Sequence, residues 1–306
     1  MNADLPIIKN ILKSPKCTQL LIEHHLEGLF FHFKLHNNPV IKESWLKQWR
    51  HNDTLKKEAL SLSQNNPSAK IVYLKGMSLL DDIYLDEGMR FMSDIDILID
   101  KSDYETIETY LQSNGFSLLQ TEKFNANSFK KEWTKNVDGV DITIETHTKL
   151  YYHVENDISS FQLKKREHLI LSFEDQIIHL ITHLSFQHTF LKLYWLFDIY
   201  FFIKKYNALI DWNLVERKIK NLKIENSFFI VTYLLETQFN LIPLLNKKPK
   251  LIWRFIFTQK LLFSSNRRTI RYFIAKHLTK DSLWLAIKYD LSLIKLAVKK
   301  VLRVST

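Results

Sequence analysis

The spacing of hydrophobic residues changes character along the chain. In residues 1–65, stretches such as "LLIEHHLEGLFFHFKLH" and "ESWLKQWRHNDTLKKEALSL" repeat apolar positions every three or four residues. This spacing is typical of amphipathic helices. Broad apolar faces of the same kind return after residue 172, in "QIIHLITHLSFQH" and "LKLYWLFDIYFFIKKY". We therefore expect helical regions at both ends of the chain.

Between these regions the pattern favours strands. "KIVYLKG" (70–76) is a short apolar run that ends in glycine, and "DIDILI" (94–99) alternates with a period of two; both patterns are typical of strands. "FKKEWTK" and "VDITIETH" flank an Asp-Gly pair at 138–139, which predicts a β-hairpin. "FSLLQT" (116–121) suits a further strand.

Local signals also predict where helices begin. Ser102, with Glu105 three residues later, has the form of a capping box, in which two side chains satisfy backbone N–H groups at the start of a helix. Ser172 and Asp175 have the same spacing ahead of a long apolar stretch. "MSLLDDIYL" (77–85) fits one or two further helical turns.

Together these elements predict an α+β fold, in which a small mixed sheet and its helices are flanked by helical N-terminal and C-terminal regions. We expect four parts: an N-terminal helical region (1–66), an α+β core (67–155), a helical domain (156–246) and a basic helical segment (247–306).

Composition is consistent with an ordered globular protein. Of 306 residues, 46% are hydrophobic and 25% are charged, which argues against disorder. The single cysteine, Cys17, excludes an internal disulfide framework and favours a reduced, cytoplasmic environment. The N-terminus has no apolar segment of signal-peptide type, and charges interrupt every apolar run before it reaches membrane-spanning length.

Positive charge is concentrated at the C-terminal end. From Lys247 onward there are 15 Lys and Arg residues and two acids, a net charge of +13, whereas the preceding chain carries −3. Such a segment suits contact with nucleic acid, an anionic membrane face or an acidic partner. A solvated face of an amphipathic helix is the simpler alternative.

The alternating "DIDILI" strand carries the first candidate chemistry. In a strand, Asp94 and Asp96 project from one face while Ile95 and Ile97 fill the other. Two carboxylates so placed can bind one or two Mg²⁺ ions, because hard cations prefer oxygen ligands. The alternative is a strand with one solvated face, which would show the same alternation of polar and apolar residues.

Other polar residues near this strand favour the metal hypothesis. "VDITIETH" offers Asp141 or Glu145 as a third acid. "LKG" ends in a glycine that lets the backbone approach a phosphate at a helix start. Acids for a metal beside bases for phosphate are typical of phosphoryl or nucleotidyl transfer. The candidate phosphate-binding residues are Lys75, Gly76, Ser78 and Arg90.

The segment "LKGMSLLDDIYLDEGMRFMSDIDILID" resembles a little-characterised bacterial nucleotidyltransferase family with the pattern K-G…Y…R-x-x-x-D-I-D-[IL]-L. That family resembles a branch of the polymerase-beta-like nucleotidyltransferase superfamily. "ITIETH" is similar to its E-x-H segment, and "FEDQIIHLITHLSFQH", "LYWLFDI" and "DWNLVERKI" are similar to its C-terminal helices. The resemblance runs from about Lys70 to Phe239 and implies a polymerase-beta-like core.

The resemblance also implies roles for individual residues. Asp94, Asp96 and Glu145 would bind Mg²⁺, and Glu145 could act as the base for the attacking hydroxyl. The substrate would be an NTP, whose NMP group passes to an unknown acceptor hydroxyl with release of pyrophosphate. Lys75, Gly76, Ser78 and Arg90 would hold the phosphates.

Two other functions remain as alternatives: a non-catalytic protein of the same fold that binds a partner or nucleic acid through the basic C-terminal segment, and an RNA-directed nucleotidyltransferase.

The helical half contributes three further candidates. His179 and His183 share a helix face, but without a third ligand they favour packing over a zinc pair. The resemblance implies that His183 and Asp198 line the cleft for the nucleotide or acceptor. Structurally, Asp198 inside an apolar helix would instead need a buried partner such as Arg90. His147, two residues beyond Glu145, is a candidate for the same cleft or for a structural role.

Overall fold

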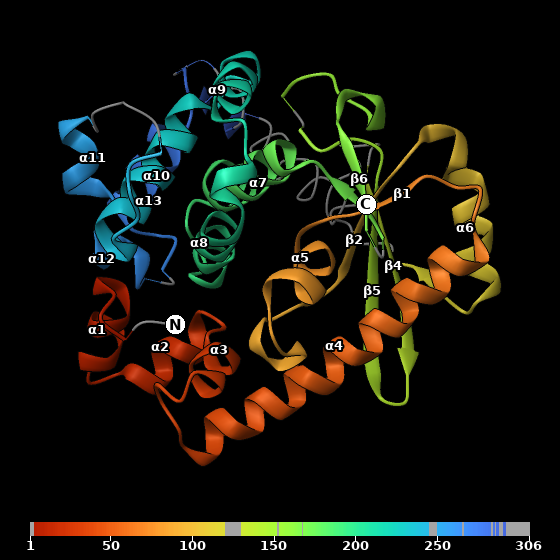
Figure 1. The fold of residues 1–306 in the computed structure, drawn as a ribbon, viewed down its shortest axis with the longest axis horizontal. Coiled ribbons are helices and arrows are strands. Elements are labelled where there is room, and N and C mark those ends of the chain that lie inside the picture. Colours follow the sequence, from red (N-terminus) through yellow and green to blue (C-terminus); the bar gives the residue numbers. More distant parts are fainter. Residues whose placement is uncertain are drawn as a thin grey trace, which may run out of the picture.

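The computed structural model describes residues 3–119, 130–151, 153–166, 168–244, 250–264, 266–282, 284, 286, 287, 290 and 291. Its central feature is a mixed seven-stranded sheet, with helices before and after it in the chain (Figure 1). The predicted α+β class is therefore confirmed. Among the described residues, no helix combines the length and the apolar character needed to span a membrane.

The sheet has the order β3-β4-β5-β2-β1-β7-β6. Strands β2 and β5 are parallel, as are β1 and β7, and the other neighbours are antiparallel. The strands are β1 (Ile71–Tyr73), β2 (Ile95–Ile99), β3 (Ser117–Leu118), β4 (Lys130–Val137), β5 (Val140–His147), β6 (Leu163–Lys165) and β7 (Leu169–Leu171).

The predicted strands are present, with differences in extent. The "KIVYLKG" strand ends at Tyr73 because Lys75 already begins a helix. Of the expected "FSLLQT" strand, Ser117 and Leu118 form β3, while Gln120 and Thr121 lie outside the described residues. Strands β6 and β7 were not predicted and continue the sheet beyond residue 155. All five residues of β2 are buried, so the alternative of a solvated β2 face is wrong.

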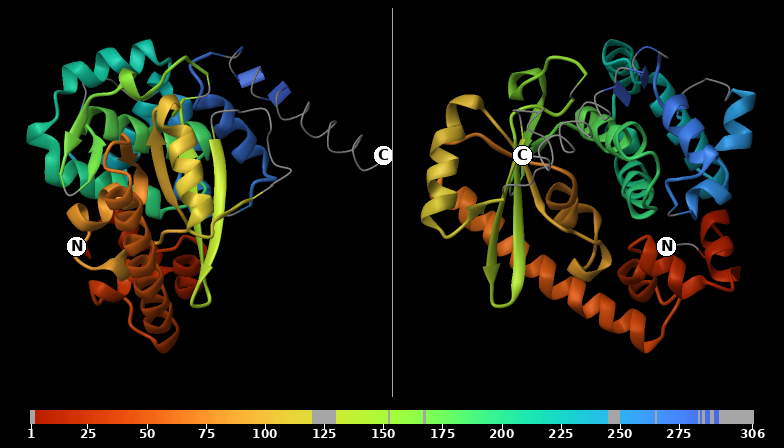
Figure 2. Two further views of the ribbon diagram at one scale, coloured as in Figure 1. Left: turned by 90° about the vertical axis from the view of Figure 1, so that its right-hand side faces the viewer. Right: turned by 180° about the vertical axis from the view of Figure 1, so that it is seen from behind.

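Helices cover both faces of the sheet. Helix α5 (Lys75–Ile83) lies on one face, and α4 (Pro39–Asn65) and α6 (Tyr104–Ser113) lie on the other (Figures 1 and 2). The predicted Ser102–Glu105 capping box is wrong, because Asp100 accepts hydrogen bonds from the backbone N–H and hydroxyl of Ser102. A short 3-10 turn forms there, and α6 begins after it.

The N-terminal helices hold the loop that leads into β2. Asn38 caps α4 by accepting a hydrogen bond from the N–H of Ile41. Further along α4, the buried Asn52 amide donates to the carbonyl oxygens of Glu87 and Arg90 at 2.6 and 2.7 Å. This contact fixes the chain just ahead of Asp94. The other N-terminal helices are α1 (Pro6–Lys13), α2 (Cys17–Glu23) and α3 (Glu27–His32).

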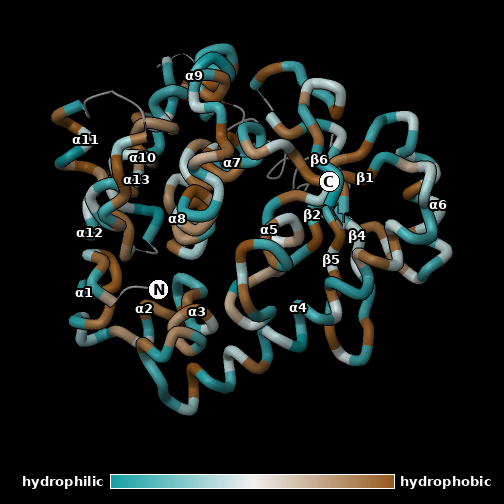
Figure 3. The backbone as a smooth tube through the Cα atoms, in the orientation of Figure 1, coloured by the Kyte–Doolittle hydropathy of each residue, from teal (hydrophilic) through white to brown (hydrophobic). Residues whose placement is uncertain are grey.

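The C-terminal half is helical, as predicted. Ser172 caps α7 by accepting a hydrogen bond from the N–H of Asp175, which confirms that helix start. Helices α7 and α8 are rich in hydrophobic residues, in contrast to the mostly hydrophilic α4 (Figure 3). The elements are α7 (Phe173–Ile181), a π-helix (Thr182–Gln187), α8 (Tyr194–Tyr206), α9 (Trp212–Asn221), α10 (Glu225–Phe239), α11 (Leu251–Ile256), α12 (Gln259–Leu262) and α13 (Ile270–Leu278).

Three further 3-10 turns complete the described elements: Glu87–Met89, Ile158–Ser160 and Asn207–Leu209. Much of the basic segment 247–306 lies outside the described residues. Within the described part, Asp290 accepts hydrogen bonds from Lys276 and His277. The expectation that this segment meets nucleic acid or an anionic surface stays a prediction, as does the cytoplasmic location.

Candidate active site

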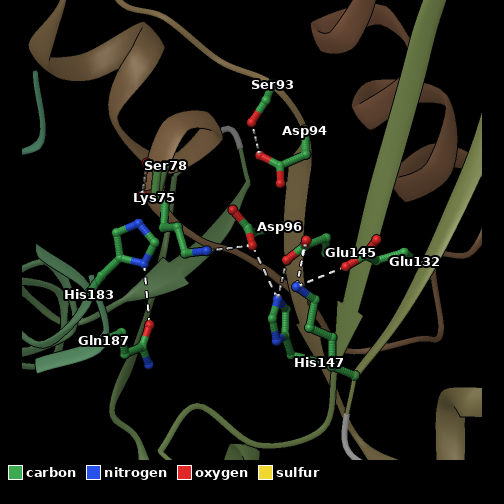
Figure 4. Close-up of polar contacts among 11 residues, drawn as sticks. Lys75, Ser78, Ser93, Asp94, Asp96, Glu132, Glu145, His147, His183 and Gln187 are labelled. Atoms are coloured by element: carbon green, nitrogen blue, oxygen red, sulfur yellow. Dashed lines mark hydrogen bonds and ion pairs between the residues drawn. The ribbon is translucent and has the colours of Figure 1, made fainter. Parts of the chain in front are cut away.

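The pairing of β2 and β5 brings two carboxylates together. In this parallel pair, Asp96 stands directly opposite Glu145, and the two residues are only 4% and 9% exposed. His147 lies two residues beyond Glu145 and therefore on the same face of β5. One ligand atom from each of these three residues lies within 4.8 Å of the others (Figure 4). The structure thus brings Glu145 to Asp96, whereas Asp141 is exposed and is held by Asn136 in the hairpin.

Two ammonium groups and an imidazole lie against these carboxylates. Lys75 Nζ lies 2.7 Å from Asp96 Oδ1, and Lys130 Nζ lies 2.6 Å from Glu145 Oε1. His147 Nε2 lies 3.1 Å from Asp96 Oδ1 and 3.4 Å from Glu145 Oε2 (Figure 4). Burial would raise the pKa of Asp96, but Lys75 and His147 hold it well below its usual value. Asp96 is therefore ionised at neutral pH.

The other site groups also have shifted pKa values. Burial alone would lower the pKa of His147, but its hydrogen bonds to Asp96 and Glu145 raise it. Burial would raise the pKa of Glu145, but the hydrogen bond from His147 lowers it. Burial would lower the pKa of Lys75, but Asp96 and the other nearby carboxylates raise it. Each of these shifts therefore follows from close pairing between the acids and bases of the site.

Asp94 lies at the edge of this group. Its carboxylate accepts a hydrogen bond from the hydroxyl of Ser93 at 3.0 Å and is not among the three residues that lie within 4.8 Å of one another. Burial and the neighbouring Asp96 carboxylate raise the pKa of Asp94 to about 7. The two aspartates of the D-x-D pair therefore differ in charge near neutral pH.

The start of α5 is strained and closely packed. Lys75 has a φ of 43°, a left-handed conformation that costs a non-glycine residue roughly 1 kcal/mol or more. A Cβ on Gly76 would lie 2.5 Å from Arg90 Nη1 and 2.7 Å from Met92 Cγ. A larger residue here would therefore displace the side chains of Arg90 and Met92.

Ser78 ties the same helix start to the helical half. Its hydroxyl donates to the carbonyl of Lys75 at 2.8 Å and accepts from the side-chain amide of Gln176 on α7 at 2.6 Å. Ser78 is buried. This hydroxyl therefore fixes Lys75 and α7 relative to each other in the structure.

Arg90 is paired with Asp198 of α8. Arg90 Nε and Nη2 donate to the two carboxylate oxygens of Asp198 at 2.9 and 2.8 Å. The hydroxyl of Tyr84 also donates to Asp198. Both charged residues are buried, and a buried bidentate pair of this kind holds its two elements in a fixed orientation. The buried partner expected for Asp198 is therefore Arg90. Contact between Arg90 and phosphate stays a prediction.

The histidines of α7 and the π-helix lie beside the site. His183 contacts Gln187 through Nδ1 at 3.3 Å and packs edge-on against Trp195. His179 is 3% exposed, and both of its ring nitrogens are buried without a hydrogen-bond partner. Burial, with a smaller effect of Lys75, lowers its pKa to about 3. His179 is therefore a neutral imidazole.

The sequence analysis did not predict that Lys130 lies beside Glu145, or that His147 contacts both Asp96 and Glu145. Counting outward from the Asp138-Gly139 turn pairs Val137 with Val140 and, seven steps later, Lys130 with His147. The hairpin register therefore contained the signal that places Lys130 beside the acids. The unpartnered nitrogens of His179 had no signal in the sequence, because they depend on contacts between distant elements.

A family model described as "uncharacterised nucleotidyltransferase" matches residues 14–240. The match covers most of the chain, which therefore belongs to this nucleotidyltransferase family. Searches of curated proteins and of solved structures found no match.

Proposed function

We propose that this member of the uncharacterised nucleotidyltransferase family transfers an NMP group from an NTP to an acceptor hydroxyl, with release of pyrophosphate. The observation that carries the proposal is the opposed, buried pair Asp96 and Glu145 on adjacent strands, surrounded by Lys75, Lys130 and His147. Acids that can hold a metal and bases that can hold phosphate lie within one small space, which is the requirement of this chemistry.

The donor set fits a divalent cation. Two carboxylates and an imidazole offer atoms within 4.8 Å of one another, and Asp94 adds a third carboxylate at the edge. Mg²⁺ is the ion implied by the resemblance to polymerase-beta-like enzymes. When bound, such an ion would polarise the α-phosphate and neutralise charge on the leaving pyrophosphate. Asp94, Asp96 and Glu145 would hold it.

The lysines would serve the triphosphate. Lys75 and Lys130 are each paired with one carboxylate of the site. Once those carboxylates face a cation, the two ammonium groups become available to neutralise phosphate oxygens. Lys75 is best placed for this role, because its strained backbone and the Ser78 hydrogen bond fix it at the start of α5.

Glu145 would accept the proton of the acceptor hydroxyl. The acceptor oxygen then forms a bond to the α-phosphorus while the bond from that phosphorus to the pyrophosphate oxygen breaks. Positioning and charge supply most of the rate enhancement in such a reaction. The acceptor could be a small molecule, a peptide or a protein, and one core can serve many acceptors.

Asparagine substitutions test the proposal. Asp96→Asn and Asp94→Asn keep the size of the side chain but remove the negative charge. We expect each to reduce metal-dependent label transfer from an α-labelled NTP by at least about a hundredfold, while circular dichroism shows a folded protein. Transfer would be measured with all four NTPs in a cell extract as the source of acceptor.

Asp100→Asn is the matched control. Asp100 follows the same strand, but its carboxylate caps the turn before α6, so activity should be unchanged. Undiminished NTP consumption in both the Asp94 and Asp96 variants would overturn the assignment of these residues.

A further inference from the structure

His147 occupies an unusual place for a histidine in a site built for a hard cation. Its Nε2 lies between the two opposed carboxylates, 3.1 Å from Asp96 Oδ1 and 3.4 Å from Glu145 Oε2 (Figure 4). The residue is 9% exposed, and the β5 backbone fixes its direction. A cation shared by the two carboxylates would therefore meet the imidazole nitrogen as well.

The three residues form one compact donor set. Among the described parts of the chain, Asp96, Glu145 and His147 are the one group of three potential ligands that lies close enough to share an ion. Asp94, which the sequence pattern placed in the metal site, lies at the edge of this group and would add a further carboxylate. The geometry thus favours a site in which an imidazole nitrogen joins the carboxylate oxygens over a site with oxygen donors alone.

We propose that His147 is a direct ligand of the cation at this site, and that the site consequently binds a divalent transition-metal ion such as Mn²⁺ more tightly than Mg²⁺. The inference rests on the proposed function, because it concerns the same cation. Mg²⁺ prefers oxygen ligands and retains its waters, whereas imidazole nitrogen adds affinity for first-row transition metals. Mn²⁺ can accept all three donors.

A second role for His147 makes a different prediction. If the imidazole only donated a hydrogen bond to Asp96, it would orient the carboxylate without touching the ion. In that case the bound ion would have oxygen ligands alone from the protein. The presence or absence of a metal–nitrogen bond therefore separates the two roles.

Pulsed electron paramagnetic resonance of Mn²⁺ bound to the full chain measures this bond directly. The expected result is a nitrogen-14 coupling of directly bound imidazole in the wild-type protein, which disappears in His147→Gln. His32→Gln, a change to a half-buried histidine on α3 outside the group, should retain it. Loss of Mn²⁺ binding in Asp96→Asn locates the ion at this site.

Competition binding gives the second measurement. His147→Gln should weaken Mn²⁺ binding at least about tenfold and weaken Mg²⁺ binding less, which lowers the preference for Mn²⁺. Mn²⁺ that depends on Asp96 but shows no nitrogen coupling would overturn the inference and leave the proposed function intact. Absence of any Asp96-dependent cation binding would contradict both.

Discussion

Asp94 and Asp96 show how strongly surroundings decide the chemistry of identical side chains. They are two positions apart, yet the pKa of Asp94 is raised to about 7 and that of Asp96 is lowered well below its usual value. Asp96 contacts Lys75 and His147, whereas Asp94 is hydrogen-bonded only to Ser93 in the described contacts. The spacing of the two acids was predictable from sequence, but their difference was not, because the compensating charges come from other elements.

The raised pKa of Asp94 predicts pH-dependent cation binding. Below pH 7 a proton occupies this carboxyl and competes with the cation, so apparent affinity should fall as pH falls, by up to about tenfold per pH unit. Calorimetric titration with Mg²⁺ at pH 6, 7 and 8 measures it. Asp94→Asn should bind more weakly at pH 8 and show a shallower dependence. Equal wild-type affinity from pH 6 to 8 would contradict this account of Asp94.

At the scale of elements, the Arg90–Asp198 pair joins the loop before β2 to α8. Tyr84, just after α5, joins the same carboxylate. The helical half is thus attached to the core next to the candidate metal site. Sequence reasoning identified Asp198 as a buried acid in need of a partner and named Arg90 as one candidate. The sequence could not decide whether Arg90 pairs with Asp198 or with a phosphate, because the guanidinium attracts either negative group.

Breaking this pair should destabilise the fold. Asp198→Leu or Arg90→Met alone leaves one buried charge without its partner and should cost about 3–5 kcal/mol in the free energy of unfolding. The double variant should lose clearly less than the sum, because no charge is left unpaired. Urea denaturation of the four proteins gives the coupling energy. Additive losses would mean that the two residues do not act as a pair.

The same double variant separates the two roles of Arg90. If Arg90 is structural, the folded double variant should keep nearly the wild-type KM for NTP. If Arg90 binds phosphate, KM should rise more than tenfold, the effect of losing a charged contact worth about 1.4 kcal/mol or more.

Element length and local sequence signals decided which parts of the sheet were predictable. Strands β2 and β5 alternate over enough residues to be recognised, and the Asp-Gly turn fixed the register of β4 with β5. Strands β6 and β7 have three residues each, too few for a period to be seen. The equally short β1 was predicted because its apolar run ends in a glycine. β7 pairs with β1 and β6 pairs with β7, and packing against the rest of the sheet sets these positions. The capping prediction at Ser102 failed because the carboxylate of Asp100 accepts the hydrogen bond from the Ser102 N–H. In a capping box the Glu105 side chain would accept it instead.

At the scale of the whole molecule, the predicted sequence of helical, mixed and helical regions is confirmed, but the contacts between regions were not predictable. Helix α1 packs against α10 although they are distant in sequence, and no residue pattern marks that contact. The burial of histidines is another consequence of such packing. Burial lowers the pKa of His24 to about 4 and that of His179 to about 3.

Buried neutral histidines should make the fold sensitive to acid. The unfolded chain binds a proton at His179 below a pKa of about 6.5, while the folded chain stays unprotonated there until about pH 3. Unfolding therefore takes up a proton in this window, and stability falls as pH decreases through it. For His179 alone the loss between pH 7 and pH 5 is about 2 kcal/mol.

His179→Leu isolates this contribution. The variant should lose about 2 kcal/mol less than the wild type between pH 7 and pH 5, measured by urea denaturation at both values. The difference between the two proteins removes the contribution of other titrating groups. Among these are Asp94 and His147, whose raised pKa values increase stability as pH falls. Identical pH dependence of stability in the two proteins would show that His179 takes up its proton at the same pH in the folded and the unfolded chain.

The central claim, nucleotidyl transfer at the Asp96–Glu145 site, is tested most directly by asking which phosphorus reaches the acceptor. The protein would be incubated in cell extract with Mg²⁺ or Mn²⁺ and with each NTP labelled at either the α- or the γ-phosphate. We predict that the α-label enters a product while the γ-label appears only in pyrophosphate. Asp96→Asn should abolish both the labelled product and the labelled pyrophosphate. A γ-label in the product, or no label transfer from any NTP with either ion, would contradict the account.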